Sequence, residues 1–176
     1  MDVLDLYERG STWSASKMSA AADQLDSPTP CDEWDVRALI NHMLDAQQWF
    51  AEVPQGSDSP GPAATPPDLL GGDPVAHYER ARQSVLDAYR DPGVREKHGL
   101  MLGICFVDQL LHGWDLAQAT GQDTAIPADL ADASFKMIGG RMADDQRGGK
   151  FKPAIAVPDD ASPQEKLLGY GGRAAR

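Results

Sequence analysis

The sequence predicts an all-α protein: an up-and-down four-helix bundle with an extra short helix and an irregular C-terminal tail. Apolar residues recur at helical spacing in long blocks, and prolines and glycines are concentrated between those blocks. Strand signals are scarce, since the clearest candidate, AIAV at 154–157, is short and flanked by prolines. A chain of 176 residues can bury a full core, and we expect residues 1–176 to form a single domain.

The first two helices are predicted over residues 2–25 and from 36 to about 51. Apolar residues follow helical spacing in the first block, and two prolines just beyond it end the pattern. Asp35 can cap the free N–H groups at the start of the second helix. Trp34 can pack against Leu39 there as a hydrophobic staple.

Residues 53–73 are rich in proline, glycine and serine, and we expect them to form a long loop or lid. The third helix, residues 74–90, opens with a proline at its first position. The fourth helix begins near Leu100 and stops at Gly121, because glycine readily takes the left-handed conformation that ends a helix.

The C-terminal part of the chain carries weaker signals. A fifth helix is predicted over residues 128–143, broken by the glycine pair at 139 and 140. Beyond it the prolines and glycines indicate an irregular tail with one helical turn around residues 164–168.

Composition excludes several classes of partner. The formal net charge of −11 argues against nucleic acid or anionic lipid, because both are bound mainly through clustered lysines and arginines. No segment approaches the run of about 18 apolar residues that spans a bilayer, and the acidic N-terminus lacks the apolar stretch of a secretory signal. Two cysteines are too few for a disulfide framework. We therefore expect a cytoplasmic protein, either a monomer or a homodimer.

The fourth helix carries the most informative pair of side chains, Asp108 and His112. Residues at i and i+4 share a helix face, so both side chains can reach one metal ion. No lysine or arginine lies between Gly99 and Phe135 to neutralise the acid. The ordinary alternative is that Asp108, His112 and Asp115 form the hydrated face of an amphipathic helix.

His42 on the second helix is the third candidate ligand. Its neighbours on that face, among them Trp49, are apolar. A lone histidine in such a position is most simply a surface or edge residue. Together with Asp108 and His112, however, it completes two imidazoles and one carboxylate. That set can hold one face of a divalent ion and leave positions open for substrate.

Other residues near this stripe have an ordinary and a functional interpretation. Asp115 can orient a ligand imidazole or bind a substrate hydroxyl, or it can be a plain helix-surface acid. A Cys105 thiolate can ligate zinc, but packing in the core is favoured, as it is for Cys31. Trp49 and Trp114 can line a substrate pocket beside the metal, although aromatic core packing is the commoner use.

Three segments, PTPCDEWDVRALINH, DQLLHGWDLAQATG and VPDDASPQEKLLGYGGR, resemble the actinobacterial metal-binding branch of the DinB superfamily. This branch is related to the N-terminal domain of mycothiol-dependent maleylpyruvate isomerase. The resemblance implies a DinB-like four-helix bundle that holds zinc, nickel or a similar divalent ion. His42 matches the first ligand position, and Asp108 with His112 matches the second pair.

The resemblance also implies mycothiol, a low-molecular-weight thiol, as a cosubstrate for transferase or isomerase chemistry. The isomerase has an additional C-terminal domain that we do not expect here, so its maleylpyruvate substrate is not carried over. Asp108 is one methylene shorter than the glutamate of some relatives, which alters its reach to a metal.

The leading functional hypothesis is a metal-dependent thiol S-transferase or isomerase that acts on a small electrophile. Two alternatives stay open: a non-haem Fe(II) enzyme, and a bundle that binds a metal or small ligand without turnover. The sequence contains no G-x-S-x-G, P-loop or G-x-G-x-x-G motif. Beyond the metal ligands, it identifies no catalytic residue.

Overall fold

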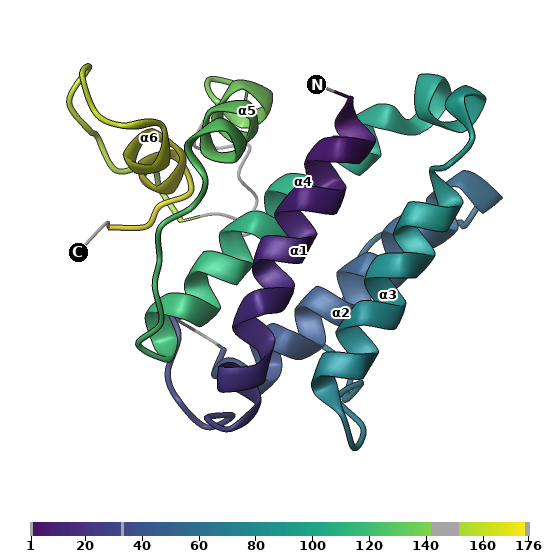
Figure 1. Ribbon diagram of the computed structural model, residues 1–176, viewed down its shortest axis with the longest axis horizontal. Coiled ribbons are helices and arrows are strands. Elements are labelled where there is room, and N and C mark those ends of the chain that lie inside the picture. Colours follow the sequence, from purple (N-terminus) through teal and green to yellow (C-terminus); the bar gives the residue numbers. More distant parts are fainter. Residues whose placement is uncertain (1, 33, 142–151, 175–176) are drawn as a thin grey trace. The chain divides into compact units, whose positions relative to one another are not determined.

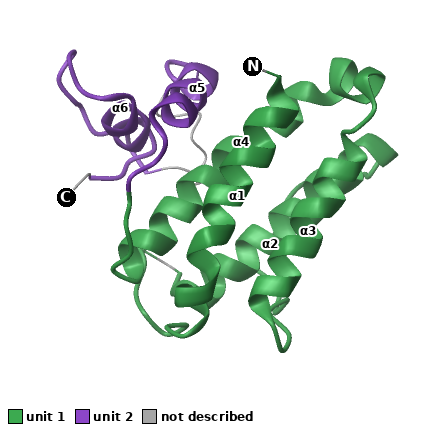
Figure 2. Cartoon of the chain, viewed as in Figure 1, with its two compact units in different colours: residues 1–124 green, residues 125–176 purple. Residues whose placement is uncertain are grey.

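The computed structural model describes residues 2–32, 34–141 and 152–174, which fall into two compact units. The first unit covers residues 1–124 and the second covers residues 125–176 (Figure 2). Within the described ranges the regular secondary structure is entirely helical, and no strand is present. The prediction of an all-α helical bundle is confirmed.

The first unit is a four-helix bundle with a short 3₁₀ helix after its second helix. Its elements are α1 (Val3–Ala22), α2 (Val36–Glu52), η1 (Val53–Gln55), α3 (Pro74–Ala88) and α4 (Pro92–Ala119). α1 packs against α4 and α3, and α2 packs against the same two helices (Figure 1). α1 and α2 therefore lie diagonally across the bundle, and α4 separates them on one side.

The predicted long loop determines the direction of α3. After η1 the chain runs back along α2, fixed by three hydrogen bonds that join Trp49 Nε1 to the Ser59 carbonyl, the Ala63 N–H to Asp45, and the Leu69 N–H to Asn41. α3 consequently begins beside the N-terminal half of α2 and runs parallel to it (Figure 1). The helical bundle is as predicted, but α2 and α3 do not alternate up and down, because the chain returns along α2 before α3 begins.

The start of α4 differs from the prediction near Leu100, which is wrong by about two turns. The helix begins at Pro92, and the Asp91 carboxylate accepts hydrogen bonds from the N–H groups of Gly93 (2.7 Å) and Val94 (3.3 Å). Proline at the first position and an aspartate cap are strong start signals. Gly93 and Gly99 weaken the helical pattern in this stretch, which is why the sequence obscures it.

The C-terminal half of α4 is buried on nearly all sides. From Leu102 to Ala117 most of its residues are buried, and Ile104, which is 44% exposed, is an exception. A helix in this position is held by neighbours on every side, so its polar side chains are placed by packing. Among the described helices, none is both long and apolar enough to cross a membrane.

The second unit contains α5 (Ala128–Ile138) and α6 (Pro163–Tyr170). α5 ends before the glycine pair, and the last two residues of the predicted helix, 142–143, lie outside the described residues. α6 is longer than the single turn predicted, because Ser162 and Glu165 form a capping box at its start. The AIAV segment is not a strand; the Ile155 N–H donates instead to the Gly169 carbonyl at 2.8 Å.

Candidate metal centre

The structure brings the three predicted metal ligands together inside the first unit. His42 extends from α2, and Asp108 and His112 extend from adjacent turns of α4. Asp108 Oδ1 lies 3.4 Å from His42 Nε2 and 3.5 Å from His112 Nε2. The side chains of His42, Asp108 and His112 are 13%, 23% and 12% exposed, so the carboxylate marks the open side of the cluster.

The spacing of these atoms fits a metal ion better than direct hydrogen bonds. N–H···O hydrogen bonds are usually about 2.7–3.2 Å long, and both contacts exceed this range. A tetrahedral ion with ligand bonds of about 2.0–2.1 Å places its ligand atoms about 3.3–3.4 Å apart. Two imidazoles and a carboxylate suit zinc, nickel or iron, and three protein ligands leave a coordination position open.

His112 is oriented by a buried carboxylate behind it. Its Nδ1 lies 2.9 Å from Asp115 Oδ2, and the Asp115 side chain is fully buried. The network assigns the proton to Nδ1, which donates to Asp115 and turns the Nε2 lone pair toward Asp108. This is the carboxylate–histidine arrangement that commonly supports metal ligands.

His42 is held mainly by aromatic packing. The Trp34 ring lies against it with centroids 4.5 Å apart, and the His112 ring meets it edge-on at 4.9 Å. His42 Nδ1 is buried and has no hydrogen-bond partner within the described part of the chain. Ring contacts, rather than a hydrogen bond from Nδ1, therefore hold this side of the imidazole.

The segment between α1 and α2 supplies residues that the sequence did not assign to the site. Thr29 Oγ1 donates to the Trp34 carbonyl at 2.6 Å and accepts from the Cys31 N–H at 3.1 Å, which ties this turn together. Trp34 is thereby placed against both histidines. In the sequence, Trp34 stands immediately before the helix that carries His42, and this position predicted only a hydrophobic staple against Leu39.

Cys31, His112 and Asp115 form a second group whose potential ligand atoms lie within 4.8 Å of one another. Cys31 Sγ donates to Asp115 Oδ2 at 3.5 Å. The contact of 2.9 Å between His112 and Asp115 is, however, an ordinary hydrogen-bond length. We therefore interpret this group as support behind His112 and not as a second ion site.

Cys105 lies on the same helix and is fully buried. Burial raises the pKa of its thiol well above the ordinary value, and the nearby Asp108 carboxylate raises this pKa further. The thiol therefore stays protonated at neutral pH and packs as a small apolar side chain.

This state of Cys105 predicts slow labelling by thiol reagents. In a Cys31→Ser variant, Cys105 is the remaining cysteine. We expect the native variant to react with iodoacetamide more than about tenfold more slowly than the unfolded variant, because each unit by which the pKa rises removes about nine tenths of the reactive thiolate. Mass spectrometry with and without urea measures both rates. Equal rates in the two conditions would contradict the assignment.

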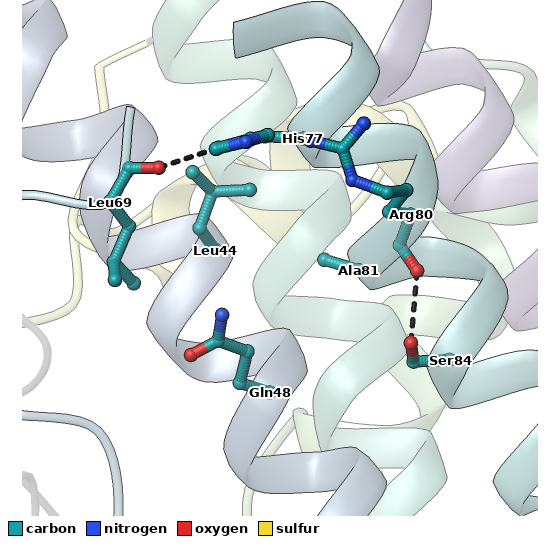
Figure 3. A pocket seen from close by; sticks show the side chains of 7 residues that line it. All are labelled: Leu44, Gln48, Leu69, His77, Arg80, Ala81 and Ser84. Atoms are coloured by element: carbon teal, nitrogen blue, oxygen red, sulfur yellow. Dashed lines mark hydrogen bonds between the residues drawn. The ribbon is translucent and has the colours of Figure 1, made fainter. Parts of the chain in front are cut away.

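Trp49 and Trp114 are placed by other contacts. The Trp49 indole donates to the Ser59 carbonyl at 3.0 Å, and Trp114 is buried at 3% exposure. A cavity of about 200 Å³ lies between α2, α3 and the loop before α3, and Figure 3 shows the residues that line it: Leu44, Gln48, Leu69, His77, Arg80, Ala81 and Ser84. No predicted site residue is in this lining, so a role of either tryptophan beside a substrate stays a prediction.

Residues 10–117 of the chain match the family model described as the mycothiol maleylpyruvate isomerase N-terminal domain. The chain belongs to this family. The matched range includes His42, Asp108, His112 and Asp115, and membership confirms the resemblance inferred from the sequence motifs.

Relatives of this family member come from Mycobacterium tuberculosis. The uncharacterized proteins MT0763 (strain CDC 1551 / Oshkosh) and Rv0738 (strain H37Rv) are each 31% identical to the chain over 189 residues. The similarity covers 100% of this chain and 100% of each relative. No solved structure matches the chain.

Proposed function

We propose that this protein binds one divalent metal ion through His42, Asp108 and His112, and uses it as a thiol S-transferase or isomerase that acts on a small electrophile. The observation that carries this proposal is the spacing of the ligand atoms, 3.4 and 3.5 Å about Asp108 Oδ1. Zinc is the preferred ion, with nickel or iron as other candidates. Membership of a mycothiol-related family supports mycothiol as the thiol.

A divalent ion in this position would lower the pKa of a coordinated thiol and so supply a thiolate nucleophile near neutral pH. The chain's own residues keep the ligands in place. Asp115 retains the Nδ1 proton of His112, which leaves Nε2 available as a ligand. Trp34 covers His42, whereas Asp108 is the more exposed ligand, so the thiol and the electrophile would approach on the side of Asp108.

A second candidate is a non-haem Fe(II) enzyme, which the two-histidine, one-carboxylate donor set favours. A bundle that binds a metal without turnover uses the same ligands. In each case we propose that residues 1–176 act as one DinB-like metal-binding domain in the cytoplasm, as a monomer or homodimer.

The test is to load the protein with Zn²⁺ or Co²⁺ and add mycothiol with a chromogenic electrophile such as 1-chloro-2,4-dinitrobenzene. We expect mycothiol to add a thiolate-to-cobalt charge-transfer band in the near ultraviolet, and thioether formation to require the metal. A Cys31→Ser control should give the same band, because Cys31 is not a ligand in this proposal.

Oxygen consumption by the Fe²⁺ form, without thioether formation, would favour the oxygenase. A spectral change without turnover would favour the binding protein, and failure to bind any metal would exclude all three.

A further inference from the structure

The side chain of Gln109 connects the two helices that carry the ligands. Its Nε2 donates to Asp108 Oδ2 at 3.1 Å and to the Met43 carbonyl at 3.3 Å, and the whole residue is buried. Met43 is the residue after His42 on α2. One amide group therefore reaches the carboxylate of one ligand and the backbone beside another.

Tyr78 on α3 determines which way this amide points. Its hydroxyl donates to Gln109 Oε1 at 3.0 Å. Burial raises the pKa of Tyr78 well above the ordinary value, so the hydroxyl keeps its proton and remains a donor. With Oε1 accepting from Tyr78, Nε2 must face Asp108 and Met43.

We propose that Gln109, oriented by Tyr78, is a positioning residue that sets the spacing between the metal ligands of α2 and α4. The inference rests on the proposed function, because it assigns the amide a role in metal binding. Asp108 Oδ2 is engaged by Gln109, so Oδ1 is the oxygen directed at both histidines. Residues that hold a metal-ligating carboxylate in this way usually change metal affinity about 10- to 100-fold when altered.

A second buried tyrosine–glutamine pair in the same bundle provides a matched comparison. Tyr7 donates to Gln47 Oε1 at 2.7 Å, and both residues are fully buried. Gln47 Nε2 donates at 3.4 Å to the Met43 carbonyl of its own helix, and no hydrogen bond joins it to a ligand side chain in the described structure. The two pairs share chemistry and burial, but only the Tyr78–Gln109 pair contacts a ligand.

The experiment compares Gln109→Met with Gln47→Met, and Tyr78→Phe with Tyr7→Phe. Isothermal titration gives the affinity for Co²⁺, the visible spectrum of bound Co²⁺ reports ligand geometry, and circular dichroism gives the Tm of the metal-free protein. We expect Gln109→Met to bind Co²⁺ about 10- to 100-fold more weakly with an altered spectrum, while Gln47→Met lowers Tm similarly but keeps wild-type affinity and spectrum. Tyr78→Phe should weaken binding a few-fold, because the amide is then able to rotate, and Tyr7→Phe should not.

Equal affinities within each matched pair, with the wild type still binding Co²⁺, would overturn the inference and leave the proposed function standing. A wild type that binds no Co²⁺ would overturn both. If Gln109→Met does not fold, the two tyrosine variants, which each remove a single oxygen, decide the question.

Discussion

His112→Ala and His42→Ala should each lower the affinity for Zn²⁺ or Co²⁺ by more than about 100-fold, since removing a ligand should cost more than the 10- to 100-fold loss typical of its supporting residues. Each variant leaves two ligand atoms of the three-ligand group. In His112→Ala the buried Asp115 carboxylate also loses the imidazole N–H that it accepts at 2.9 Å, so this variant should lose some stability as well.

Elemental analysis after reconstitution, together with titration calorimetry, measures the loss, and circular dichroism checks that the helices are retained. His98→Ala is the matched control, because His98 lies on the same helix as His112 and belongs to neither group of potential ligands. Wild-type affinity in both ligand variants would remove the basis of the proposed metal centre. An equal loss in the control would point to a general effect of the substitution.

Gly113→Ala should destabilise the protein by about 1–3 kcal/mol, the usual cost of overpacking a core. A Cβ at this position would overlap Ser14 Oγ and would lie 2.7 Å from Ser14 Cβ and 3.0 Å from Ser14 Cα. Ser14 also donates to the Gln109 carbonyl at 2.7 Å, so α1 and α4 are in close contact at this level. The backbone of Ser14 cannot move away without separating the two helices.

Gly99→Ala is the matched control for this prediction, and its effect should have the opposite sign. Gly99 also lies in α4, but the nearest atom to its added Cβ is Val3 Cγ1 at 3.9 Å, an ordinary contact. Alanine there should stabilise the helix by about 0.5–1 kcal/mol. Urea denaturation of both variants gives the two free-energy changes, and a stabilising Gly113→Ala would show that the helices are less tightly packed than the structure indicates.

Much of the site was accessible from local sequence patterns. The spacing of Asp108 and His112 alone places both on one face of a helix, because the helical repeat is a local property of the chain. The start of α4 was missed for an equally local reason, since two glycines hid the signal of Asp91 and Pro92. Gly99 and Gly113 look alike in the sequence. Only the position of α1 shows that a side chain fits at Gly99 and does not fit at Gly113.

The sequence by itself determined the helical class of the protein, most helix boundaries and three candidate ligands, because helix periodicity and capping depend on residues a few positions apart. The tertiary structure decided that His42 meets the pair on α4, that Trp34 and Cys31 join them, and that Gln109 connects the ligand helices. Those contacts link residues far apart in the chain. They exist only because the packing of the bundle places α2, α4 and the turn before α2 side by side.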